Sequence, residues 1–173
     1  NLNLIKIKRK FSIIYRNSEK NSNLYNLIKF IKACRKKHIK FFIANNFALA
    51  LRTNANGVYL SSYNKELFKT NTKFGKKFEI IGSAHNFGEI NIKKKQGCKS
   101  IVLSRLFKTD YKNKKSFYGI TKFNLLIKNY RDCFIALGGI RSKNLMKLKM
   151  LNCEGVALLS EVKKKPAIIR RLF

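Results

Sequence analysis

Two adjacent glycines, Gly138 and Gly139, separate a short apolar run from a polar segment, a pattern that lets backbone amides approach a phosphate group. The apolar run, 133–137, has the composition of a buried strand, and the polar segment predicts the start of a helix. The N-terminus of such a helix adds a dipole that favours anions. After the next apolar run, the loop 158–161 is a second candidate for the same anion. These features predict a phosphate-binding site.

Metal and disulfide chemistry of cysteine and histidine is not indicated. The two histidines, His38 and His85, stand in no zinc-ligand spacing. The cysteines form no CxxC pair and mostly lie in apolar surroundings, so we expect reduced core residues. They are Cys34, Cys98, Cys133 and Cys153.

The chain is strongly basic, with 39 Lys and Arg against 8 Asp and Glu. Such an excess suits nucleic acid, an anionic surface or an anionic small substrate. However, it is mostly lysine, spread through every segment with many Asn and Ile, which is typical of residue usage in an AT-rich genome. No aromatic pattern of the RNA-recognition type and no zinc knuckle accompanies it. We expect the charged runs to be solvated helix faces or loops: 35–37, 93–95, 112–115 and 163–165.

Seven short apolar runs alternate with helical segments along the whole chain. The runs are rich in Ile, Val and Phe and are mostly apolar throughout, which is typical of strands buried on both faces. With no hairpin signal between them, they predict parallel strands with right-handed crossovers. The predicted strands are 11–16, 40–44, 57–61, 78–82, 100–104, 133–137 and 155–160.

Helix boundaries are indicated by capping residues. Asn86 and Glu89 have the spacing of a capping box, and Gly97 predicts the end of the same helix. Ser142 is the candidate cap of the helix after the paired glycines.

Two architectures fit seven βα units: a doubly wound open sheet, or a (β/α)8 TIM barrel lacking its first βα unit. A barrel normally needs about 200 residues or more, and this chain has 173 and begins with Asn. We expect the barrel, as a single domain over 1–173. No apolar run approaches the ~20 residues of a membrane helix. Lys and Arg interrupt the first ten residues, so we expect no signal peptide and no membrane, but a cytoplasmic protein.

Four segments, in order, resemble the thiamine-phosphate synthase family, which includes the TenI-type thiazole tautomerases. The resemblance covers nearly the whole chain from Phe11 onward. The segments are 56–64 (NGVYLSSYN), 80–109 (from IIGSAHNFGEI to LFKT), 136–144 (ALGGIRSKN) and 153–161 (CEGVALLSE).

This resemblance implies a reaction as well as the barrel fold. The family's synthases join hydroxymethylpyrimidine diphosphate to a thiazole phosphate and release pyrophosphate. The pyrimidine–oxygen bond breaks first, and the thiazole nitrogen captures the resulting cation. Departing negative charge calls for Mg²⁺, Lys, Arg and amide donors. The implied partners are the two phosphorylated substrates, and barrels of this kind commonly associate as homo-oligomers.

Site residues follow from the resemblance position by position. Arg16 corresponds to a diphosphate or pyrimidine contact, and the implied catalytic residues are Ser83, His85 and Lys112. The implied thiazole-phosphate site consists of the loop residues Thr109, Gly138, Gly139, Leu159 and Ser160.

The chain departs from the family at the pyrimidine-diphosphate half. Asn45 and Asn64 stand where the family has its two metal-binding aspartates, and Ala44 precedes Asn45. A neutral amide oxygen can contact Mg²⁺ without neutralising its charge as a carboxylate does. Ile14 and Ser18 replace the Gln and Lys that flank the family's strand-end arginine.

Three functions stay open at this point. The first is a synthase with altered metal use. The second is a TenI-like tautomerase, in which His85 would transfer the proton because imidazole titrates near neutral pH, or a non-catalytic thiazole-phosphate binder. The third is a basic nucleic-acid-binding module, which only the net charge favours.

Overall fold

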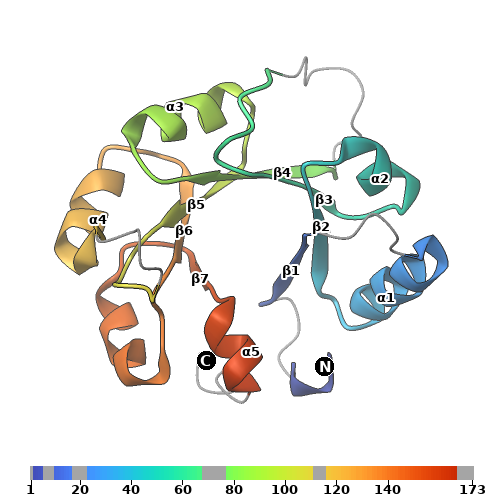
Figure 1. Cartoon of the computed structure of the whole chain (residues 1–173). Coiled ribbons are helices and arrows are strands. Elements are labelled where there is room, and N and C mark those ends of the chain that lie inside the picture. The colour runs from blue at the N-terminus through green and yellow to red at the C-terminus, as the bar shows by residue number, and fades with distance from the viewer. Residues whose placement is uncertain (1, 6–9, 17–22, 68–76, 111–115, 167–173) are drawn as a thin grey trace.

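The computed structural model describes residues 2–5, 10–16, 23–67, 77–110 and 116–166. Seven parallel strands form one sheet in chain order, and the sheet curls with the helices around its outer side (Figure 1). In these residues no ladder joins the first strand to the last, so the barrel is open there. The strands are β1 (Ser12–Tyr15), β2 (Lys40–Ala44), β3 (Gly57–Leu60), β4 (Glu79–Ala84), β5 (Ser100–Ser104), β6 (Cys133–Leu137) and β7 (Gly155–Ala157).

All seven predicted strands are thereby confirmed, with the barrel that lacks one unit. Helices follow most strands, and a 3-10 helix connects β6 to β7. No helix in the described part of the chain has the length and apolar character needed to cross a bilayer. The helices are η1 (Leu2–Leu4), α1 (Leu24–Lys36), α2 (Phe47–Arg52), α3 (Phe87–Lys95), α4 (Gly119–Ile127), η2 (Ser142–Met150) and α5 (Ser160–Lys164).

The strands are mostly apolar because the central strands are buried on both faces, as the four buried residues of β3 show. In β2, Phe41 and Ile43 belong to the cluster that includes α1 residues. Phe42, between them, belongs to a different cluster with Tyr59 of β3 and side chains of β4 and β5. Alternate residues of one strand therefore fill the helix-facing layer and the inside of the barrel.

Capping explains where α3 begins and ends. The Asn86 side chain accepts a hydrogen bond from the Glu89 amide at 2.9 Å, as predicted. The Glu89 carboxylate bonds the His85 amide at 2.7 Å, one residue further back than a capping box requires. Gly97 follows the helix with a φ of 72°, a left-handed conformation that suits glycine.

Two local predictions are wrong. Ser142 does not cap η2, because Asn144 caps the Arg141 amide at 2.8 Å and Ser142 contacts Glu161 instead. The charged run 93–95 is not uniformly solvated, because the Lys93 side chain is fully buried.

Candidate functional site

A cavity of about 210 Å³, the Thr109 cavity, lies at the carboxyl ends of β5 and β6, where a parallel barrel places its ligand site. One wall is the segment 107–110 after β5, and the other is formed by the loop after β6. Two predicted phosphate-site residues, Thr109 and Gly139, meet here. The β6 side of the cavity is lined by Gly139, Arg141, Lys143 and Asn144.

Gly139 allows these two loops to pack closely. It has a φ of +67°, and a Cβ there would lie 2.5 Å from the Lys108 carbonyl oxygen. The Phe107 amide donates to the Gly138 oxygen at 3.0 Å, and the Asn144 amide group donates to the Gly139 oxygen at 2.9 Å. The paired glycines therefore fix one loop against the other, and this contact shapes the cavity.

The cavity combines cations with an unsatisfied hydroxyl. Arg141 donates to Asp110 at 2.5 Å, and this partner lowers the pKa of the Asp110 carboxyl through its hydrogen bond and charge. Lys108 and Lys143 also line the space. Thr109 Oγ1 is buried and has no hydrogen-bond partner in the described residues. A buried hydroxyl without a partner is costly, so this atom is suited to a ligand acceptor.

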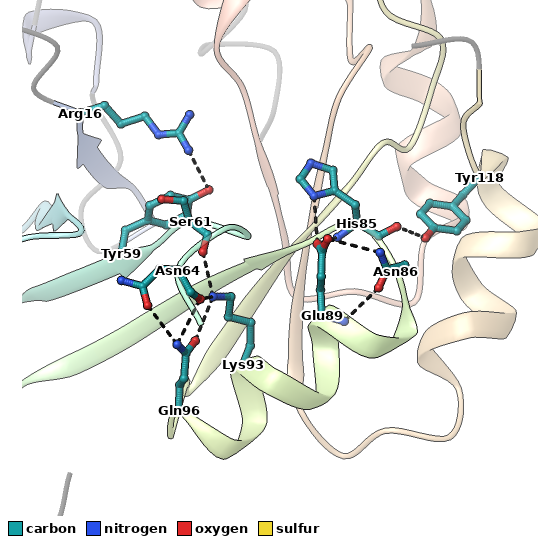
Figure 2. Close-up of polar contacts among 10 residues, drawn as sticks. All are labelled: Arg16, Tyr59, Ser61, Asn64, His85, Asn86, Glu89, Lys93, Gln96 and Tyr118. Carbon is teal, nitrogen blue, oxygen red and sulfur yellow. Dashed lines mark hydrogen bonds and ion pairs between the residues drawn. The ribbon is translucent and has the colours of Figure 1, made fainter. Parts of the chain in front are cut away.

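A second cavity of about 130 Å³ contains His85, together with Arg105 and Tyr118. The His85 Nδ1 lies 3.1 Å from a Glu89 carboxylate oxygen, and the Tyr118 hydroxyl donates to the His85 carbonyl oxygen (Figure 2). Burial, and then the charge of Glu89, raises the pKa of Tyr118. The carboxylate of Glu89 thus holds the imidazole in place at the edge of this cavity.

Arg16 lies at the end of β1 and contacts Tyr59 of β3. Its guanidinium carbon is 5.2 Å from the centre of the Tyr59 ring, and its Nη2 is 3.5 Å from the Tyr59 hydroxyl (Figure 2). Ser83 lies in β4 and is buried. Neither residue is among those that line the Thr109 cavity.

Three predicted site residues remain: Lys112, Leu159 and Ser160. Lys112 lies outside the described residues. Ser160 begins α5, and Leu159 before it is 52% exposed. Neither is among the residues that line the Thr109 cavity. The neighbouring Glu161 connects the last two loops by accepting from the Ser142 amide at 3.3 Å and from its hydroxyl at 3.2 Å.

Asn45 and Asn64 do not fit a magnesium site. The Asn45 Oδ1 accepts from the Ser61 amide at 2.9 Å, and its Nδ2 donates to the Tyr63 hydroxyl at 2.9 Å. The Asn64 Oδ1 accepts from Gln96 at 3.1 Å and from a backbone amide at 3.1 Å. Both oxygens are engaged, and both groups are neutral, whereas Mg²⁺ prefers carboxylates and water. No cluster of three acidic, His or Cys side chains exists among the described residues.

Sequence reasoning missed the three cations that line the cavity, Lys108, Arg141 and Lys143. Arg141 stands two residues after the paired glycines, at the helix start that was predicted to bind phosphate, and this position was the signal that could have identified it. Among 39 basic residues, however, no pattern of spacing separates these three from the others.

The family model for thiamine monophosphate synthase matches residues 4–162. Thiamine-phosphate synthase of Prochlorococcus marinus (strain AS9601) is 32% identical over 141 residues, which cover 81% of this chain and 40% of that protein. The Pelagibacter ubique (strain HTCC1062) thiamine-phosphate synthase is 29% identical over 164 residues, covering 91% of this chain and 77% of the relative. The chain thus spans about two fifths of the Prochlorococcus protein.

Solved structures share the fold. Thiamine phosphate pyrophosphorylase from Pyrococcus furiosus superposes with a TM-score of 0.70 at 19% identity, covering 93% of this chain and 81% of that one. N-(5'-phosphoribosyl)anthranilate isomerase from the same organism gives a TM-score of 0.63 at 14% identity, over 93% and 86% of the two chains. At these identities the likeness concerns the fold alone.

Proposed function

The chain belongs to the thiamine monophosphate synthase family, and we propose that it joins hydroxymethylpyrimidine diphosphate to a thiazole phosphate. The observation that carries this proposal is the Thr109 cavity. It combines the buried Thr109 hydroxyl, which has no partner in the described residues, with two loops that pack closely at Gly139. Basic side chains line the same space. These are the groups that a phosphate monoester requires.

The proposed reaction assigns the substrates to different parts of the barrel. The thiazole phosphate binds with its phosphate in the Thr109 cavity, where the hydroxyl and Arg141 donate to its oxygens. The pyrimidine–oxygen bond of the other substrate breaks, and its electron pair leaves with pyrophosphate. The thiazole nitrogen then uses its lone pair to form the new carbon–nitrogen bond. Arg16 and the predicted Lys112 stabilise the departing charge.

No step of this proposal passes through Mg²⁺, because the side chains at the two asparagine positions do not fit it. Ser83 stays a predicted catalytic residue, and Leu159 and Ser160 stay predicted phosphate contacts. The four cysteines are free, which supports the proposed cytoplasmic location. A single domain over 1–173 and a homo-oligomer also stay predictions.

The direct test has a synthesis arm and a binding arm. Purified protein with both substrates should form thiamine phosphate, detected by mass spectrometry, and no product at high protein concentration would contradict the proposal. In the binding arm, Thr109→Val removes the hydroxyl that the phosphate would occupy. Loss of a hydrogen bond to a charged group costs about 1.5–3 kcal/mol, so thiazole-phosphate affinity should fall about 10- to 150-fold. Calorimetry measures this.

A matched control is Thr121→Val, because Thr121 is an exposed threonine of α4 outside the cavity. It should bind as wild type does. Equal affinity of wild type and Thr109→Val would show that the phosphate does not use this hydroxyl.

The second candidate is a TenI-like tautomerase, favoured by the pairing of His85 with Glu89 in the smaller cavity. In that reaction the imidazole moves a proton on the thiazole phosphate. Isomerisation followed by NMR, lost in His85→Ala while thiazole-phosphate binding persists, would support it. Binding with neither isomerisation nor synthesis would leave a non-catalytic binder.

A further inference from the structure

Lys93 is a fully buried cation to which neither cavity assigns a role. Its side chain leaves α3 and ends beneath the segment 61–66, which follows β3 (Figure 2). The ammonium group donates to the Ser61 carbonyl at 2.8 Å, the Asn64 carbonyl at 2.6 Å and Gln96 Oε1 at 2.9 Å. Lysine has three N–H donors, so every one of them is satisfied by a neutral oxygen.

Gln96 completes the connection between α3 and this segment. It is also fully buried, and its amide group donates to Asn64 Oδ1 at 3.1 Å and to the Glu66 carbonyl at 2.7 Å. Lys93 and Gln96 together therefore hold four oxygens of the segment 61–66. Asn45 then bonds the Ser61 amide, which extends the same network to the end of β2.

Strand β4 leaves space for the Lys93 side chain at Gly82. A Cβ at Gly82 of β4 would lie 2.8 Å from Lys93 Cγ and Cδ, so this strand has glycine where the lysine stem passes. The stem also lies beside the buried Cys98. A solvated lysine that happened to fold inward would not need such space in a neighbouring strand.

The three oxygens around the ammonium, two loop carbonyls and the Gln96 side-chain oxygen, resemble the oxygen ligands of a metal ion. A divalent cation gathers oxygens of one loop and fixes their orientation. Here the ammonium does so with hydrogen bonds from below the loop. A Mg²⁺ ion at Asn45 and Asn64 would have to displace amide donors from both side-chain oxygens, beside a buried like charge.

We propose that Lys93 is a built-in cation that orders the segment 61–66 in place of a divalent metal, so that Asn45 and Asn64 position this loop without binding Mg²⁺. Lys93 is thus a positioning residue and does not touch substrate. The comparison with a metal rests on the proposed function, because only the family resemblance assigns a metal to these asparagines. The hydrogen-bond network itself does not depend on it.

Metal titration of the wild-type protein is the first test. Mn²⁺, used as a paramagnetic probe, should show no saturable binding by electron paramagnetic resonance at millimolar concentration. Mg²⁺ should leave hydrogen exchange of the segment 61–66 unchanged. Saturable binding with a matching protection of this segment would overturn the inference.

Removing the charge is the second test. Lys93→Met keeps the length of the stem and leaves buried carbonyls without donors, so amides of 61–66 should exchange at least about tenfold faster. Lys95→Met, at an exposed position of the same helix, should leave their exchange as it is in wild type. Unchanged exchange in a folded Lys93→Met protein would refute the positioning role.

The third and most specific test asks whether substitutions can create a metal site at these positions. The double variant Asn45→Asp/Asn64→Asp should still fail to bind Mn²⁺, because the ammonium stays bound to the carbonyl of residue 64, next to one of the new carboxylates. Adding Lys93→Met should create saturable binding. Should that triple variant not fold, Mn²⁺ binding by the double variant would by itself overturn the inference. None of these readouts uses catalysis, so absence of synthesis would contradict the proposed function alone.

Discussion

Replacing Gly139 with alanine should destabilise the protein and damage the Thr109 cavity together. The residue has a φ of +67°, where a non-glycine residue costs about 1–2 kcal/mol. The added Cβ would also meet the Lys108 oxygen at 2.5 Å and the Phe107 oxygen at 2.6 Å. Both are backbone atoms, so the loops must separate to relieve the contact. We expect a total loss of about 2–4 kcal/mol in the free energy of unfolding.

Urea unfolding followed by circular dichroism measures this loss, which corresponds to a drop of roughly 5–15 °C in Tm for a domain of this size. Thiazole-phosphate affinity should fall in the same variant, because one wall of the cavity moves. The control is Gly88→Ala in α3, where the Cβ meets only Asn86 Oδ1 at 3.5 Å and alanine favours the helix. A Gly139→Ala protein within 0.5 kcal/mol of wild type would show that the loops are not packed as described.

Three further predictions concern other parts of the molecule. Asp110→Asn removes the carboxylate that occupies Arg141, so calorimetry should show tighter binding of thiazole phosphate, and weaker binding would mean that the ion pair organises the cavity. Burial raises the pKa of Cys98 to about 12. A thiol reagent at pH 8 should therefore leave this thiol unmodified in the native protein and modify it once guanidinium unfolds the chain. Rapid labelling of the native protein would contradict the burial of Cys98. Asn86→Ala removes the cap of α3 and should cost about 1 kcal/mol in urea unfolding, while Asn91→Ala on the exposed face of that helix should cost less; equal losses would exclude a capping role.

The strands were predictable because their composition reflects burial on both sides. The bounds of β2, β5 and β6 coincide with the apolar runs 40–44, 100–104 and 133–137. A strand between two apolar layers is apolar at its central positions, so its ends are visible where polar residues begin. The order of seven such strands then leaves few topologies.

The candidate site was less predictable because its polar contacts join segments distant in the sequence. Ser142 is a residue type that commonly caps helices, but its hydroxyl donates to Glu161 instead. The Asn144 side chain accepts from the Arg141 amide at the helix start. Thr109 was identified through the family resemblance and Gly139 first through the paired-glycine pattern, whereas Arg141 was indistinguishable from many surface cations. Only the packing of the two loops brings these three together.

Lys93 shows that the sequence pattern also does not reveal which of the many lysines are buried. A run of three lysines predicts a solvated face, yet one of them, Lys93, is buried and donates to carbonyl oxygens inside the protein. The family resemblance implies two aspartates and Mg²⁺ at the positions of Asn45 and Asn64, where their opposite charges would offset each other. Two amides and one ammonium leave a net positive charge at the same edge of the barrel. Because Lys93 is fully buried, its charge acts on the loop and not on a ligand, and Arg16 stays the exposed cation predicted to meet a diphosphate leaving group.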